Sequence, residues 1–187
     1  MQWGNTSKTY GWATIILHWL AAAGVLAMLY IGLSAGWAED AHNMDGHRAL
    51  MRLHVSLGLT LWLILAARIA WHYAQKSPEP ARQAAPLNLL SKITQNALLI
   101  AVALLIISGP LMIWSGARPL SAWGVVSLPS PFGTRNKEVH EAAELIHTVG
   151  RYGLYVLIPI HVLGALKHLM LDRDGVFRRM LWPSPLA

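Results

Sequence analysis

The sequence contains no cysteine. This absence excludes disulfide bonds, thiolate metal ligands, iron–sulfur clusters and the thioether links that attach a c-type haem. A metal in this protein must therefore be held by other side chains, and the nine histidines are the first candidates.

Charged residues are also scarce: they make up 13% of the 187 residues, whereas hydrophobic residues make up 55%. Average globular domains contain about 25% charged residues. A bilayer core takes roughly 20 apolar residues per helix, so the chain has room for about four spans and short loops. The net charge of +6 is spread around the apolar runs and forms no stripe, which argues against nucleic-acid binding. We expect one integral membrane domain over residues 1–187.

Four apolar runs predict an all-α, four-helix membrane bundle, with spans at about 13–35, 50–71, 93–114 and 139–171. The first run is too long for a signal-peptide core. Pro78, Pro80 and Pro86 predict a connecting loop, and Pro159 predicts a kink in the fourth helix. The Gly-, Pro- and Ser-rich segment 115–137 predicts an ordered or surface-hugging loop.

Loop charges predict the orientation in the membrane. Nine of the fifteen basic residues fall on the side that would hold both termini, and six fall on the other side. The nine are Lys8, Arg68, Lys76, Arg82, Lys92, Lys167, Arg173, Arg178 and Arg179. Because basic loops stay inside, we expect both termini in the cytoplasm.

Four histidines, His18, His54, His147 and His161, lie at membrane depth in the predicted spans, where an ionisable side chain marks a functional site. His147 and His161 are 14 residues apart on the fourth helix, which places them about 21 Å apart in depth and about 40° apart around the axis. With this orientation His147 is level with His54 near the periplasm, and His161 is level with His18 near the cytoplasm.

Each opposed pair can clamp a planar macrocycle, which predicts two haem b groups and a relay of electrons across the membrane. The alternative is that these histidines are buried hydrogen-bonding groups or line a proton path. For His42, His47 and His140 we expect solvated surface positions. His72 and His168 fall near the cytoplasmic end, where His168 can reach a haem carboxylate.

Haem propionates need cationic partners where they are partly desolvated. Arg52 and Arg151 lie near the periplasmic histidines, and Arg68 and Lys167 lie near the cytoplasmic pair. For Arg151, snorkelling to the lipid headgroups is an equal alternative.

The pattern resembles the bacterial cytochrome b561 family of four-helix di-haem proteins, which includes superoxide:quinone oxidoreductases. The resemblance runs over nearly the whole chain. Its motifs are Ile16-Leu17-His18-Trp19, Leu53-His54-Val55-Ser56-Leu57-Gly58, the pair His147 and His161, Ala165-Leu166-Lys167-His168, Asp172-Arg173-Asp174 and Arg178-Arg179-Met180-Leu181.

The resemblance implies ligation of haem iron by His18 with His161 and by His54 with His147, quinone as an electron partner, and the inner membrane of a Gram-negative bacterium. It leaves open the periplasmic donor or acceptor, superoxide included, and whether the chain is an enzyme or a carrier. One alternative is the cytochrome b anchor of a larger dehydrogenase or hydrogenase. Another is a small histidine-bearing proton or metal transporter. A homodimer also remains open.

Overall fold

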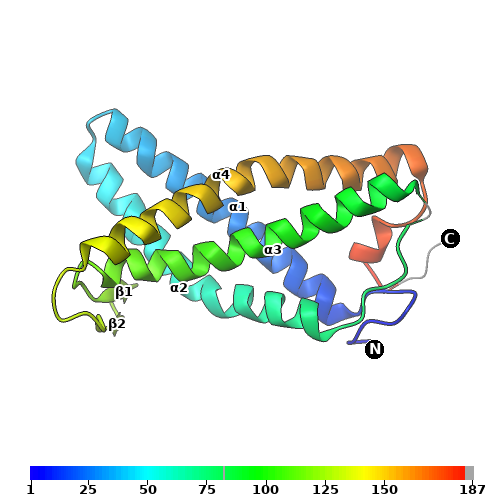
Figure 1. The fold of residues 1–187 in the computed structure, drawn as a ribbon, viewed down its shortest axis with the longest axis horizontal. Coiled ribbons are helices and arrows are strands. Elements are labelled where there is room, and N and C mark those ends of the chain that lie inside the picture. The colour runs from blue at the N-terminus through cyan, green and yellow to red at the C-terminus, as the bar shows by residue number, and fades with distance from the viewer. Residues whose placement is uncertain (82, 184–187) are drawn as a thin grey trace.

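Four long helices dominate the chain (Figure 1). In this computed structural model, which describes residues 1–81 and 83–183, they are α1 (Trp12–Asp40), α2 (Met44–Ala74), α3 (Ala85–Trp114) and α4 (Lys137–Lys167). Each is long and apolar enough to cross a membrane. The prediction of an all-α membrane bundle is therefore confirmed. Arg82, one of the basic residues used for orientation, lies outside the described residues.

The helices extend beyond the predicted spans, because polar caps continue them past the apolar runs. The side chain of Asn43 accepts a hydrogen bond from the amide of Gly46 and starts α2 six residues before the predicted span. Asn136 caps α4 in the same way. The expectation that Pro86 lies in the connecting loop is wrong, because Pro86 occupies the first turn of α3, where its missing amide hydrogen is not needed.

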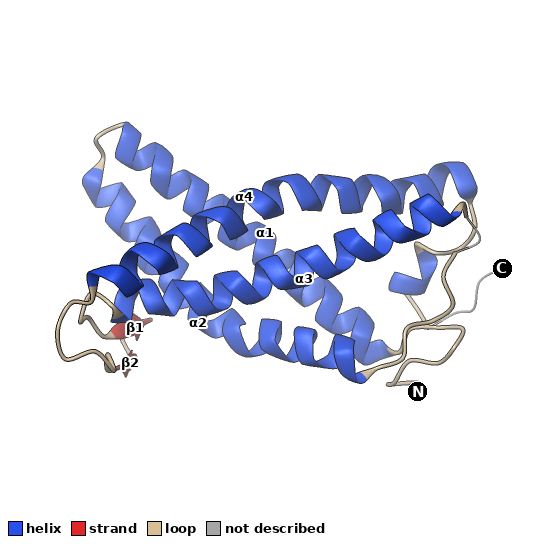
Figure 2. Cartoon of the chain, viewed as in Figure 1, coloured by secondary structure: helices blue, strands red, loops and turns tan. Residues whose placement is uncertain are grey.

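The helices form two antiparallel hairpins. α1 packs closely along α2, and α3 packs along α4, whereas α1 and α4 are not in close contact in the described chain. Residues 1–11, 75–81, 83–84 and 168–183 gather at one end of the bundle, which we call the termini end (Figure 2). The opposite end contains the turn 41–43 and the segment 115–136.

The end of α4 changes its winding. α4 is continuous through Pro159 as far as Lys167, and a π-helix, η1 (His168–Asp172), then carries the chain to about the predicted end of the span. A 3-10 turn, η2 (Arg178–Met180), folds back over the termini end. There both terminal nitrogens of Arg179 donate to the carbonyl of Glu79, at 3.1 and 3.2 Å.

The segment between α3 and α4 holds a small antiparallel hairpin that the sequence did not predict. Its strands are β1 (Leu120–Ala122) and β2 (Val126–Leu128), and Ser121 pairs with Ser127. β1 packs against α2 and α3. The expectation of an ordered or surface-hugging loop is thus met by a defined hairpin whose first strand packs against two helices.

Candidate functional site

The structure brings the four predicted histidines together in two pairs. The ring centroids of His18 on α1 and His161 on α4 are 6.1 Å apart, with an angle of 60° between the planes. The ring centroids of His54 on α2 and His147 on α4 are 6.4 Å apart, at 68°. The first pair lies toward the termini end and the second toward the opposite end, as the depths of the residues along their helices require.

The distance within each pair fits a shared metal ion. A metal bound at about 2 Å to one nitrogen of each imidazole leaves the two ring centroids about 6 Å apart. Directly hydrogen-bonded or stacked rings would lie closer together. Both pairs also join helices from different hairpins, so that a group held between them would occupy the interior of the bundle.

α3 has no histidine, but its residue Ser108 contacts His147 of α4. Ser108 is 1% exposed, and its Oγ lies 3.1 Å from Nδ1 of His147. The same hydroxyl lies 3.5 Å from the carbonyl of Leu105, and when it donates there its oxygen can accept a hydrogen from Nδ1. In that tautomer Nε2 of His147 keeps a lone pair for a metal, as is usual for a histidine ligand whose other ring nitrogen donates a hydrogen bond.

Two glycines lie beside the rings of His54 and His147, where a side chain would contact them. A Cβ atom at Gly32 of α1 would lie 3.5 Å from Cε1 of His54, and one at Gly109 of α3 would lie 3.7 Å from Cε1 of His147. Nδ1 of His54 is buried and has no hydrogen-bond partner within the described chain. All four helices therefore contribute to the surroundings of the pair His54 and His147.

Sequence reasoning missed Ser108 and Gly109. A signal was present, because Ser108-Gly109-Pro110 interrupts an otherwise apolar span. Without the packing of α3 against α4, however, that signal does not identify which histidine the serine contacts.

Two of the predicted cationic residues have a buried nitrogen without a partner among the described residues. In Arg68, which lies near His18 and His161, this nitrogen is Nη1. In Arg151, which lies near His147, it is Nε, and the guanidinium carbon lies 4.9 Å from the centroid of the Tyr152 ring. A buried guanidinium nitrogen without a partner favours an anionic ligand.

The other two cationic candidates differ. Arg52 is exposed on α2. Lys167 forms an ion pair with Asp172. The structure thus separates Arg68 and Arg151, which have unused buried donors, from Arg52 and Lys167, which do not.

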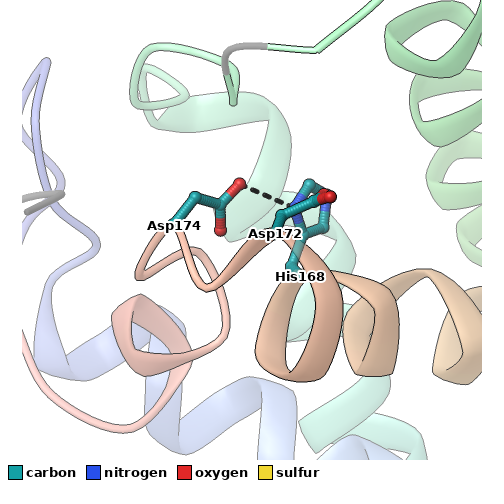
Figure 3. A group of neighbouring side chains, drawn as sticks. All are labelled: His168, Asp172 and Asp174. Carbon is teal, nitrogen blue, oxygen red and sulfur yellow. Dashed lines mark hydrogen bonds and ion pairs between the residues drawn. The ribbon is translucent and has the colours of Figure 1, made fainter.

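His168 belongs to a cluster of its own at the end of α4 (Figure 3). Its Nδ1 lies 2.8 Å from Asp174 and 3.2 Å from Asp172, and its side chain is almost fully buried. Asp172 also pairs with Lys167, so the cluster joins two carboxylates, one ammonium group and the imidazole. The nitrogen that faces these aspartates is therefore engaged, and contact of His168 with a haem carboxylate stays a prediction.

The other histidines differ partly from expectation. His42 is exposed in the turn between α1 and α2, as expected, and His72 is half-buried at the end of α2. His47 is half-buried, with Nδ1 at 3.0 Å from the carbonyl of Ala35. His140 is also half-buried: its Nδ1 lies 3.1 Å from Oγ of Ser115 and 3.0 Å from the carbonyl of Met112. The expectation of solvated positions is wrong for His47 and His140, because both rings link neighbouring helices.

Comparison with known proteins agrees with this geometry. Residues 9–183 match the family model described as prokaryotic cytochrome b561. The chain belongs to the prokaryotic cytochrome b561 family. Cytochrome b561 homolog 2 of Escherichia coli strain K12 is 30% identical to it, over 98% of this chain and 97% of the relative.

Membership in the cytochrome b561 family indicates where the four apolar helices lie and which kind of cofactor the protein binds. The protein is a multi-pass protein of the bacterial inner membrane. The family implies haem b and transmembrane electron transfer. The residues of this chain fit that cofactor in three respects: paired imidazoles at a metal's spacing, a serine hydroxyl beside Nδ1 of His147, and buried nitrogens of Arg68 and Arg151 without a partner among the described residues.

Proposed function

We propose that the chain holds two haem b groups, one between His18 and His161 and one between His54 and His147, and that it carries electrons between the two faces of the membrane. The observation that carries the proposal is the spacing of 6.1 and 6.4 Å between the ring centroids of the two pairs. When bound by two imidazoles, haem b supplies a one-electron couple with no open coordination position, which favours outer-sphere transfer.

The chain's own residues would set the properties of each site. The hydrogen bond between Ser108 and Nδ1 of His147 fixes that ring and increases its basicity. Arg68 is placed to offset the negative charge of a propionate near the termini end, and Arg151 to do so near the opposite end. Arg52 and Lys167 are weaker candidates for propionate partners, because one is exposed and the other is paired with Asp172.

The proposed orientation has the termini end in the cytoplasm. It is supported by the excess of basic residues in the segments that lie at the termini end of the bundle. His18 and His161 would then lie toward the cytoplasm, and His54 and His147 toward the periplasm. Electrons would pass between a periplasmic donor or acceptor, for which superoxide is a candidate, and the quinone pool of the membrane. The protein would act as a quinone-linked oxidoreductase or carrier.

A second candidate is the cytochrome b anchor subunit of a larger dehydrogenase or hydrogenase. The described residues form one helical bundle, and a partner subunit or a second copy of the chain would bind at its surface. A proton or metal transporter is disfavoured, because the chain belongs to a cytochrome family. Co-purification from native membranes under mild detergent distinguishes a free carrier from an anchor subunit.

The decisive experiment is a haem count on the purified protein. We expect a pyridine haemochrome of b type with two haems per chain, and a reduced spectrum typical of low-spin, six-coordinate iron. One haem per chain would overturn the two-site proposal, and a protein without a Soret band would overturn the redox function.

A further inference from the structure

The hairpin of β1 and β2 carries an uncharged, apolar surface at its turn. Residues 119–134 contain no charged residue, although Arg118 and Arg135 stand at either side. Trp123 is 55% exposed, Val125 84% and Val126 41%. Together with Gly124 these three residues form what we call the hairpin tip. Three exposed apolar side chains at an uncharged turn indicate an interaction surface.

The backbone of the tip is held in an uncommon conformation. Trp123 has φ +56° and Gly124 has φ +72°, and the amide of Val125 donates to the carbonyl of Ala122 at 3.2 Å. These features define a type I′ turn, which normally places Asn, Asp or Gly where this chain has tryptophan. A bulky residue with positive φ is rare, so its presence calls for a compensating interaction.

The compensation comes from α2. The amide of Trp123 donates to Oγ of Ser56 at 3.0 Å, and its indole Nε1 donates to Oγ1 of Thr60 at 2.9 Å. The hydroxyl of Thr60 in turn donates to the carbonyl of Ser56 at 3.0 Å. Leu120 and Ala122 of β1 are buried where this strand packs against α2 and α3. Hydrogen bonds to Ser56 and Thr60 therefore hold the tip against the side of α2.

The contacts on α2 give the depth of the tip. Ser56 and Thr60 lie four and eight residues beyond Arg52, the last charged residue before the apolar run, or about 6 and 12 Å along the helix axis. Leu63, one turn further, is 70% exposed and faces lipid. The tip is therefore continuous with the lipid-facing surface of α2.

We propose that the hairpin is a re-entrant membrane anchor, with the tip Trp123–Val126 inserted among the acyl chains of the leaflet at the opposite end. Part of its polar surface is paired: the hydroxyls of Ser121 and Ser127 lie 3.2 Å apart, so that one donates to the other, and the carbonyl of Leu128 accepts from Nε1 of Trp114 at 3.4 Å. The flanking Arg118 and Arg135 would remain at the headgroups. This inference does not depend on the proposed haem sites.

The test uses the absence of native cysteine. The full chain carrying Val125→Cys is labelled with a nitroxide, reconstituted in phosphatidylcholine vesicles, and examined by power saturation with oxygen and with a water-soluble nickel chelate. We expect the label at Val125→Cys to be accessible to oxygen and protected from nickel. The matched control is Thr134→Cys, an exposed position in the same connection, where we expect nickel to reach the label.

Two results would overturn the anchor. Equal nickel access at Val125→Cys and Thr134→Cys would place the tip in water. Protection from both oxygen and nickel would show that protein, for example a second copy of the chain, covers it. If Val125→Cys does not fold, Val126→Cys reports on the same tip.

A second variant tests how the tip is held. Thr60→Val removes the acceptor for the indole of Trp123 but keeps the shape of the side chain. In the Val125→Cys background it should move nickel access toward the value of Thr134→Cys. Unchanged access would mean that the bond to Thr60 does not hold the tip in place.

Discussion

The hydroxyl of Ser108 on α3 lies 3.1 Å from Nδ1 of His147 on α4. A second pair of the same kind lies about two helical turns away, where the hydroxyl of Ser115 lies 3.1 Å from Nδ1 of His140. Both serines are almost fully buried on α3 or at its end. Only His147 faces a second histidine, so the two serine–histidine bonds should have different consequences for electron transfer.

Ser108→Ala should raise the midpoint potential of one haem. Loss of the hydrogen bond at Nδ1 makes the imidazole a poorer donor and destabilises the ferric state. A tenfold change in relative affinity corresponds to about 60 mV for one electron, which sets the scale of the shift. Redox titration measures it. Ser115→Ala should leave both potentials unchanged, and an equal shift in the two variants would contradict a specific role for Ser108.

Histidine replacements should act in pairs. His18→Ala and His161→Ala should each remove the same haem, and the double replacement should lose no more than either single one, because two ligands serve one iron. His54→Ala and His147→Ala should remove the other haem. The measurement is a haem count with redox titration on folded protein. If the His18 and His161 variants retained different haems, the pairing would be wrong.

Arg68→Gln should lower the potential of the haem between His18 and His161. A buried positive charge beside the site disfavours the extra positive charge of ferric iron, and its removal stabilises that state by an amount on the order of tens of millivolts. Arg52→Gln, at an exposed position on the same helix, is the control and should have little effect on that haem. A larger shift of that haem's potential in the Arg52 variant than in the Arg68 variant would contradict the placement of Arg68 beside this haem.

Labelling should show opposite accessibility for the two ends of the bundle. Ser77→Cys lies in the exposed connection at the termini end, and Thr134→Cys lies at the opposite end. In intact spheroplasts an impermeant thiol reagent should modify Thr134→Cys and spare Ser77→Cys, because basic residues favour the cytoplasm. The reverse pattern would invert the orientation while leaving the fold and the histidine pairs unaffected.

The helices and the four histidines could be predicted because both depend on periodicity along single helices. The 14-residue spacing of His147 and His161 sets their common face and their depth before any packing is known. The helix ends were less predictable, because Asn43 and Asn136 extend helices beyond the apolar runs through local hydrogen bonds.

Contacts between helices could not be predicted from those periodicities. Ser108 gains its importance only from the packing of α3 on α4, and His140 is half-buried only because Ser115 and Met112 reach it. Trp123 lies in a turn that normally takes smaller residues, and the reason is found on α2, far away in the sequence. Such partners are defined by tertiary structure and leave little trace in local composition.

The division of the bundle into two helix pairs has a consequence for biogenesis. Because α1 packs along α2 and α3 along α4, each pair can leave the translocon as a finished unit before the other is made. α1 and α4 carry opposed ligands without close contact of their own, so the cofactor would add to the contacts of α2 with α3 and β1 that hold the units together. We therefore expect cells starved of haem to accumulate inserted but loosely assembled chains, which quality-control proteases of the membrane would degrade first.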